Sequence, residues 1–116
     1  MSILVLEKII DEHLNTYMSV PVYSELPKSK PETFVRFERT SGSNTNLIDS
    51  GTIAIQSYAT SLYGAITLNE EVKTVMGTIT ARGDVSACKL ENDYNFTDTK
   101  TKQYRYQAVF SITYYK

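Results

Sequence analysis

Two segments of the chain repeat apolar residues at the spacing of an amphipathic helix. Between residues 2 and 18 the apolar positions are Leu6, Ile9, Ile10, Leu14 and Tyr17, and charged residues occupy the other side. Between residues 60 and 80 the stripe comprises Leu62, Ala65, Ile66, Asn69, Val72, Val75, Met76 and Ile79. We expect a helix in each segment, with Gly83 as the stop signal of the second.

Alternation of apolar and polar residues predicts the strands. Residues 33–40 and 51–59 alternate, except that Phe34 falls on the polar side of its strand. The clearest alternation lies in residues 104–115, whose apolar face comprises Tyr104, Tyr106, Ala108, Phe110, Ile112 and Tyr114. These three segments are therefore expected to contribute one face each to a common core.

Two further segments predict a short strand and a mixed strand. Residues 20–26 contain Pro21, which favours an edge position because proline cannot donate to a strand ladder. In residues 85–96, Val85, Ala87 and Leu90 are expected to face the core.

The order of these elements predicts the fold class. It reads helix, three strands, helix, two strands, or α-β-β-β-α-β-β. We expect one α+β domain over residues 1–116, with a mainly antiparallel sheet of four to five strands and two helices packed on one face. Such a sheet buries both helical stripes.

Two polar segments join predicted strands. The first, residues 41–50, is expected to be a flexible ten-residue loop that includes Ser41, Gly42, Ser43, Asn44, Thr45, Asn46 and Asp49. The second includes Thr97, Asp98, Lys100 and Lys102. Long loops in small domains are uncommon unless they are functional or disordered. We therefore expect both segments to become ordered on contact with another protein.

Composition and charge narrow the function classes. The chain has 116 residues with 12 Lys and Arg against 13 Asp and Glu, a net charge of −1. The electrostatic footprint of a nucleic-acid binder is missing, and no apolar run is long enough to cross a bilayer. The apolar patch near the N-terminus is expected to be part of the first helix and not a secretory signal.

Candidate catalytic groups are few. Cys88 is the only cysteine and His13 the only histidine, on different predicted elements, and His13 is expected on a solvated helix face. Glu70 and Glu71 are adjacent on a helix and point in different directions. We therefore predict no enzyme activity and no catalytic, metal or cofactor site.

The aromatic row of residues 104–115 permits two interpretations. Tyr104, Tyr106, Phe110 and Tyr114 could stack bases on an open sheet, or they could pack against the helices as core. The second is favoured, because the row also contains Ala108 and Ile112 and no cluster of Lys or Arg frames it.

The order of several short motifs resembles the tail terminator family, also called tail completion or head-to-tail joining proteins, of long non-contractile-tailed bacteriophages. "VPVYSELP" is similar to the family's first strand, and "FVRFERTSG" to its V-x-x-E-R-x-G-G motif, with Ser41 in place of a glycine. Asp49 and "IAIQSYA" are similar to the returning L-x-V-Q-x-W-A segment, with Tyr58 in place of tryptophan. "DYNFTD" and "YRYQAVFSITY" resemble the closing Y-x-F-P-D and R-Y-Q motifs, with Thr97 in place of proline.

The resemblance implies a virion structural protein of a siphophage or prophage, without catalysis or cofactors. Its copies would form a homo-hexameric ring, or stay monomeric until assembly. The ring caps the major tail tube protein, ends tail elongation and joins the tail to the head–tail connector. Its place would be the head-proximal end of the virion tail, after assembly in the host cytoplasm. Neither nucleic-acid recognition nor membrane contact is expected.

A ring of head-to-tail contacts needs two different complementary surfaces on each subunit. Mixed-sign, hydrogen-bonding candidates for subunit contact are Arg36, Glu38, Arg39, Arg105 and Gln107. Two alternatives remain: another head–tail connector or tail tube component, or a small nucleic-acid-binding α+β module that uses the tyrosine-rich strand.

Overall fold

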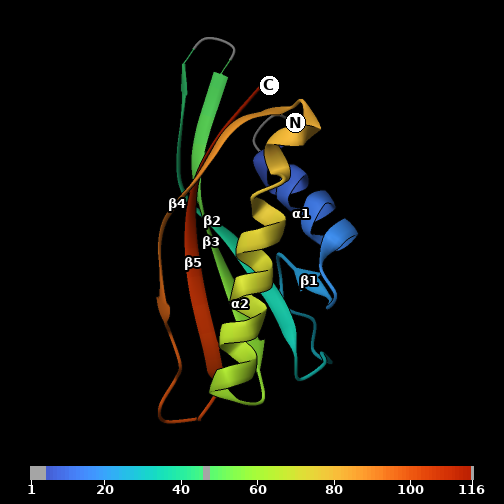
Figure 1. The fold of residues 1–116 in the computed structure, drawn as a ribbon, viewed down its shortest axis with the longest axis vertical. Coiled ribbons are helices and arrows are strands. Elements are labelled where there is room, and N and C mark those ends of the chain that lie inside the picture. The colour runs from blue at the N-terminus through green and yellow to red at the C-terminus, as the bar shows by residue number, and fades with distance from the viewer. Residues whose placement is uncertain (1–4, 46–47, 116) are drawn as a thin grey trace.

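The computed structural model describes residues 5–45 and 48–115, and its elements follow the expected order (Figure 1). They are α1 (Val5–Tyr17), β1 (Val22–Tyr23), β2 (Phe34–Thr45), β3 (Ile48–Ala59), α2 (Leu62–Met76), the 3-10 helix η2 (Ile79–Arg82), β4 (Val85–Asn95) and β5 (Tyr104–Tyr115). The α+β class and the order α-β-β-β-α-β-β are confirmed.

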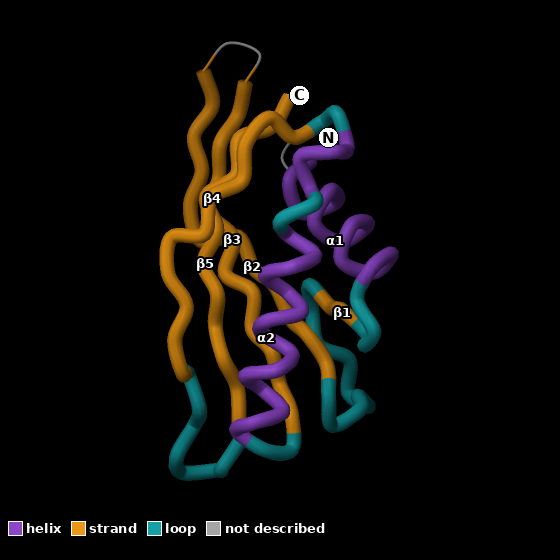
Figure 2. Tube along the Cα trace, viewed as in Figure 1, coloured by secondary structure: helices purple, strands orange, loops and turns teal. Residues whose placement is uncertain are grey.

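The strands form one five-stranded sheet in the order β1-β2-β3-β5-β4. Neighbours are antiparallel except β1 and β2, which are parallel and pair only through Val22↔Val35 and Tyr23↔Arg36. Both helices lie on one side of the sheet (Figure 2). We call that side the helix face and the opposite side the outer face. The short β1 lies at the edge, as Pro21 predicts.

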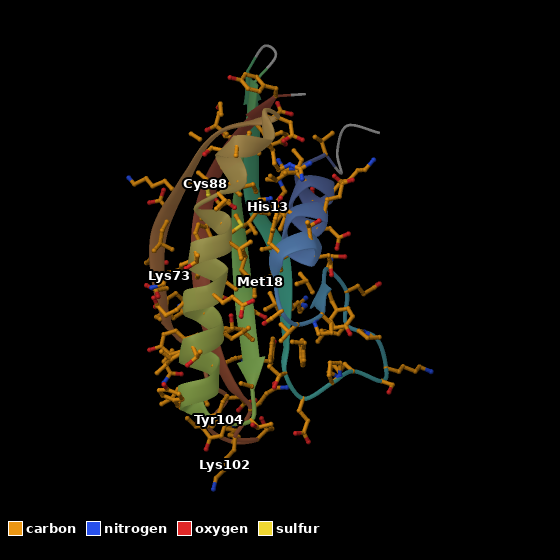
Figure 3. The ribbon with its side chains drawn as sticks, turned by 45° about the vertical axis from the view of Figure 1, so that its right-hand side comes forward. His13, Met18, Lys73, Cys88, Lys102 and Tyr104 are labelled. Carbon is orange, nitrogen blue, oxygen red and sulfur yellow. The ribbon has the colours of Figure 1, made fainter. Side chains whose placement is uncertain are left out.

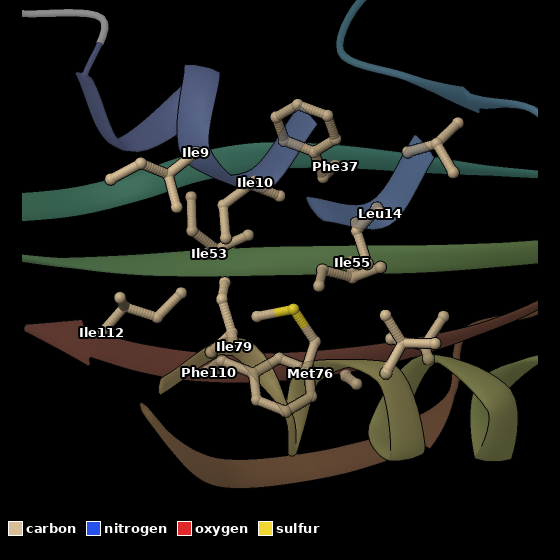
Figure 4. Close-up of a cluster of buried hydrophobic side chains, with 14 of the residues drawn as sticks. Ile9, Ile10, Leu14, Phe37, Ile53, Ile55, Met76, Ile79, Phe110 and Ile112 are labelled. Atoms are coloured by element: carbon tan, nitrogen blue, oxygen red, sulfur yellow. The ribbon is translucent and has the colours of Figure 1, made fainter. Parts of the chain in front are cut away.

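The hydrophobic core lies between the helix face and the two helices (Figure 4). The apolar stripes of the sequence meet there because alternate strand residues share a face and helical residues three or four apart share a side. Strand residues in the core include Val35, Phe37, Ile53, Ile55, Ala108, Phe110, Ile112 and Tyr114. Tyr114 is only 1% exposed. The core interpretation of the aromatic row is therefore confirmed for Phe110 and Tyr114, whereas Tyr104 and Tyr106 are half-buried.

Local signals explain where α2 begins and ends. The Ser61 side chain accepts a hydrogen bond from the Gly64 backbone N at 3.0 Å, which caps the helix start. The helix ends at Met76, earlier than expected, and η2 carries Ile79 back into the core. Gly83 then adopts a left-handed conformation with φ of 83°, so the expected stop is confirmed.

The expected flexible loop at residues 41–50 is wrong. Its two sides continue β2 and β3, with register from Ser41↔Thr52 to Thr45↔Ile48, so only residues 46–47 separate the strands. Asn46 itself lies outside the described residues. The polar composition of residues 41–50 led to the wrong prediction. A polar segment still forms a strand when a neighbouring strand supplies its backbone hydrogen-bond partners. Here β5 pairs with β3 as far as Ile48↔Tyr115.

Strand β4 also departs from the expected inward pattern. A register shift between Val85 and Ala87 leaves Ala87 exposed, and Cys88 packs against the core instead. Leu90 is 39% exposed. The bulge reverses the side-chain alternation after the extra residue, which turns Ala87 outward and puts Cys88 and Leu90 on the helix face, opposite Ile112 and Phe110. Leu90 stays partly exposed there on the edge strand. A second shift occurs between Leu90 and Asn92.

Candidate functional site

Each side chain that the sequence analysis considered for catalysis is buried or contacts a neighbouring residue. Burial raises the pKa of the Cys88 thiol to about 11, so the nucleophilic thiolate is scarce near neutral pH. The Glu70 carboxylate lies 2.6 Å from Lys73 Nζ, and Glu71 accepts hydrogen bonds from Ser19 N and Oγ. Within residues 5–45 and 48–115, no group of three or more His, Cys, Asp or Glu could hold a metal ion.

His13 is not on a solvated face, contrary to expectation. It is 2% exposed, because it follows Ile9 and Ile10 at helical spacing and falls on the apolar stripe. Its Nε2 donates to Val75 O at 3.0 Å and lies 3.1 Å from Thr78 Oγ1. His13 therefore fastens α1 to the end of α2 (Figure 3).

A largely apolar groove of about 450 Å³ runs beside His13 between the helices. Tyr17, Val75, Ala81 and Arg82 contribute to its walls. At its rim, Arg82 Nε lies 2.9 Å from Asp84 Oδ1 and its Nη2 lies 3.1 Å from Glu12 Oε1. This guanidinium lowers the pKa of Asp84.

The outer face carries a row of hydrogen-bonded amides that crosses four strands. Gln56 Nε2 donates to Gln107 Oε1 at 2.8 Å, and Gln107 Nε2 donates to the Tyr94 hydroxyl. Tyr58 OH and Arg36 Nη1 both donate to Gln56 Oε1, at 3.0 and 3.4 Å. These hydrogen bonds can form across the strands because the pairing of β3 with β5 places Gln56 opposite Gln107, and the pairing of β4 with β5 places Tyr94 opposite Gln107.

A row of aromatic rings lies next to these amides on the outer face. Phe34 stacks on Tyr58 with ring centroids 4.4 Å apart and meets the edge of Tyr23 at 6.0 Å. The Arg105 guanidinium follows, 5.8 Å from the Tyr58 ring and 4.6 Å from Phe96. Tyr23, Phe34, Tyr58 and Arg105 come from β1, β2, β3 and β5, so every strand except β4 contributes a residue to this row. The position of Phe34 on the polar side of its strand is the sequence signal for this second, thinner apolar layer.

The connection between β4 and β5 is an ordered turn. Asp98 pairs with Gln103 in an isolated bridge, and Asp98 Oδ1 accepts from Lys100 N at 3.0 Å. Hydrogen bonds from the backbone N of Lys100 and Thr101 to this carboxylate lower the pKa of Asp98. Lys102 closes the turn with φ of 55°. Arg105 Nε donates to Phe96 O at 2.7 Å and ties the turn to the strand that follows it.

The expected subunit-contact residues divide between the two faces. Arg36, Glu38, Arg105 and Gln107 lie on the outer face, where Arg36 Nη1 is 3.7 Å from Glu38 Oε1. Arg39 does not join them. It shares the helix face with Phe37, because the two are two residues apart in β2, and its Nη1 lies 3.7 Å from Glu7 Oε1.

The two expected assembly segments lie at opposite ends of the sheet. Residues 41–45 and 49 form the hairpin end, while Thr97, Asp98, Lys100 and Lys102 lie in the turn at the other end (Figure 1). The longest dimension of the molecule is 44 Å. The segments therefore cannot form one common site in a single subunit.

A polar hollow of about 510 Å³ lies at the end that carries the turn. Its walls include Lys28, Lys30, Phe34, Thr60 and Gln103. Arg105 Nη1 donates to Gln103 Oε1 at 3.3 Å, so the hollow continues into the aromatic row. Lys28 and Lys30 belong to the loop after β1, which the sequence analysis did not assign to a site.

A further cluster at the β4 edge escaped sequence reasoning. Asp93 Oδ2 accepts from Asn69 Nδ2 at 2.8 Å and from Lys73 Nζ at 3.0 Å. The cluster fastens α2 to the edge strand and places an inward-pointing charge there. The helical spacing of Asn69 and Lys73 was a weak signal, since it identified their helix but not the strand they contact.

The chain matches no protein-family model, and no curated protein is similar to it in sequence. No helix among the described residues has the length and apolar character needed to span a bilayer.

Proposed function

We propose that this chain is a phage virion structural protein whose copies form a ring on the end of the tail tube. The ring stops tail elongation and joins the tail to the head–tail connector. The motif order described above suggests this role, and the shape of the subunit supports it.

The observation that carries the proposal is the difference between the two sheet edges. One edge is the 11-residue strand β4 with two register shifts. At the other, β1 covers only Val35 and Arg36, and among the strands described the remainder of β2 pairs with β3 alone. Unlike edges supply the two different surfaces that a head-to-tail ring requires.

The two ends of the subunit support a protein with two further partners. The β2–β3 hairpin and the turn at residues 96–103 project from opposite ends of the sheet, so a ring could present one to the tube and the other to the connector (Figure 1). The hairpin is a paired β-structure. We therefore propose that a preformed hairpin docks on the partner. This replaces the expectation that a flexible loop becomes ordered on assembly.

Tail tube assembly in vitro tests the proposal. Tube subunits of the same phage or prophage are polymerised with and without this protein, and tube lengths and labelled ends are measured by electron microscopy. We expect tubes to elongate freely alone and to stop, with the protein on one end, when it is added. Unchanged lengths and unlabelled ends would contradict the proposal, and long tubes of this protein alone would make it a tube subunit.

Matched shortenings of the two ends refine the test. Replacing residues 45–48 by Asn-Gly keeps Asn44 opposite Asp49 in a two-residue hairpin, and replacing residues 99–102 by Asn-Gly keeps the bridge between Asp98 and Gln103. We expect one variant to fold but fail to cap tubes. The other should cap tubes but fail to join heads. Capping and joining by both variants would exclude a role for either end.

A further inference from the structure

The subunit has an uneven charge distribution across its layers. The two helices carry five carboxylates against Lys8 and Lys73, namely Glu7, Asp11, Glu12, Glu70 and Glu71. Glu7, Glu12 and Glu70 are paired with Arg39, Arg82 and Lys73, whereas Asp11 and Glu71 have no ion pair among the described residues. The end of the sheet that holds the hollow carries Lys28, Lys30, Lys100, Lys102 and Arg105 against Glu25, Glu32 and Asp98. We call this second region the basic end.

The lysines of the basic end are available to a partner. In the described part of the chain, none of its four lysines has a carboxylate oxygen within ion-pair distance, whereas Lys73 is held by Glu70 and Asp93. The nearby Asp98 carboxylate is already used by the backbone N of Lys100 and Thr101. The basic end therefore has an excess of positive charge, on lysines that have no ion-pair partner among the described residues.

Aromatic anchors adjoin the basic end. Phe96 is 38% exposed and Tyr94 40% exposed, and their rings meet edge-on with centroids 6.1 Å apart. Arg105 is held over Phe96 by its bonds to Phe96 O and Gln103 Oε1. The Tyr94 hydroxyl accepts from Gln107 and keeps its own proton for an acceptor on a partner. Exposed Tyr, Phe and a preorganised Arg are the residues that dominate protein interfaces.

We propose that the basic end of one copy docks on the acidic helix layer of the next copy. This inference rests on the proposed ring and names one subunit contact in addition to those of the unlike sheet edges. Lys100 and Lys102 of the turn then lie near this contact, and Lys28 and Lys30 of the loop after β1 are its centre. The acidic layer lies on the helix face, whereas the anchors Tyr94, Phe96 and Arg105 lie along the outer face and its end. One subunit can therefore engage two neighbours at once, and complementary charge fixes the direction of the contact.

A charge-swap experiment tests the contact without the tube. Lys28→Glu/Lys30→Glu and Asp11→Lys/Glu12→Lys are prepared separately, with Lys89→Glu as the control on the exposed part of β4. Self-association is measured by sedimentation velocity at high protein concentration and low salt, after circular dichroism confirms folding. We expect each double variant to self-associate at least about tenfold more weakly than wild type, since like charges then meet.

Mixing the two double variants gives the decisive result. The mixture restores opposite charges at every contact, so we expect association to return to the wild-type level and to weaken in high salt. The control variant should associate like wild type. Wild-type association by either double variant alone, or no recovery on mixing, would overturn the inference.

Zero-length carbodiimide crosslinking of heavy and light isotope-labelled protein locates the contact. We expect heavy–light links from Lys28, Lys30, Lys100 or Lys102 to helix carboxylates such as Asp11 and Glu70. Links confined to other surfaces would overturn the inference. So would loss of oligonucleotide binding in Lys28→Glu/Lys30→Glu with self-association intact, because the basic end would then be a nucleic-acid surface.

The failure of this contact is distinguishable from the failure of the proposed function. If Lys28→Glu/Lys30→Glu caps tail tubes as efficiently as wild type, the ring stands and this contact does not. If wild-type protein links basic end to helix layer but caps no tube, the contact stands and the tail function does not.

Discussion

The two faces of the sheet are built on different principles, although they share every strand. The helix face buries aliphatic and aromatic side chains under α1 and α2. No helix of the described residues covers the outer face, yet Gln56 and Tyr58 are each only 5% exposed there because amides and rings cover one another. Strand alternation, reset at each bulge, decides which residue enters which layer. A face without helices is therefore not an unstructured face.

Two phenylalanines in β2 offer the largest test of this difference. Phe37 and Phe34 are 1% and 2% exposed and lie on opposite faces. We expect Phe37→Ala to lower the free energy of unfolding by about 3–5 kcal/mol, since it opens a cavity in the main core. Phe34→Ala should cost about half as much, because Phe34 lines the polar hollow, where neighbouring groups and water can fill the space that the ring leaves.

Urea unfolding followed by circular dichroism measures both variants. Ile53→Val serves as a mild control on the helix face, because it shortens a side chain in the same core as Phe37 without emptying the site. We expect this control to lower the free energy of unfolding by about 0.5–1.5 kcal/mol. An equal loss for Phe34→Ala and Phe37→Ala would show that the outer face is a second full core.

The helix face was the part of the fold that the sequence could predict. Val35, Phe37, Ile53 and Ile55 fall on clean periods, so their burial and the α+β order followed directly. The hairpin at residues 41–45 was missed because its polar composition indicates a loop, whereas its ladder depends on pairing with the equally polar start of β3 and, beyond it, with the distant strand β5. The shift after Val85 was missed because a bulge leaves no compositional mark.

The candidate site was less predictable than the fold. Arg36, Arg105 and Gln107 were predicted as subunit-contact candidates and lie on the outer face, but their partners Gln56 and Tyr94 were not identified. A hydrogen bond across strands depends on register, which one sequence does not specify when both segments are polar. The lysines of the hollow lie in a loop whose path no periodicity determines.

Removing the outer-face amides should have a smaller effect than removing Phe37. Gln56→Leu leaves the buried Gln107 Oε1 without the donor it has now, and we expect a loss of about 1–3 kcal/mol in unfolding free energy. Gln107→Leu should cost a similar amount. The double variant should cost clearly less than the sum, because it leaves neither amide of the pair unsatisfied. Additive losses in urea unfolding would show that the row is not a connected network.

Replacing His13 tests how much a buried polar side chain contributes to stability within the apolar core under the helices. His13→Leu removes the Nε2 bonds to Val75 O and Thr78 Oγ1 but also removes a buried Nδ1 that has no hydrogen-bond partner among the described residues. Val75 O keeps its bond from Thr78 Oγ1 at 2.7 Å. We therefore expect a net loss of about 1 kcal/mol in unfolding free energy. A loss as large as that of Phe37→Ala would make His13 the main fastening of α1.

The ion pair between Arg82 and Asp84, at the rim of the groove between the helices, should contribute least to the free energy of unfolding, and only above acidic pH. Arg82 lowers the pKa of Asp84, so the folded state binds the Asp84 proton more weakly than the unfolded state does. The stabilisation is therefore present above the unfolded pKa of about 3.9 and is lost as the pH falls through the lower folded value. Because the Asp84 side chain is 41% exposed, solvent screening keeps the effect small. We expect Asp84→Asn to be slightly less stable than wild type at neutral pH and equal to it in strong acid, measured by urea unfolding across pH. A difference that persists at acid pH would assign the effect to packing of the side chain and not to its charge.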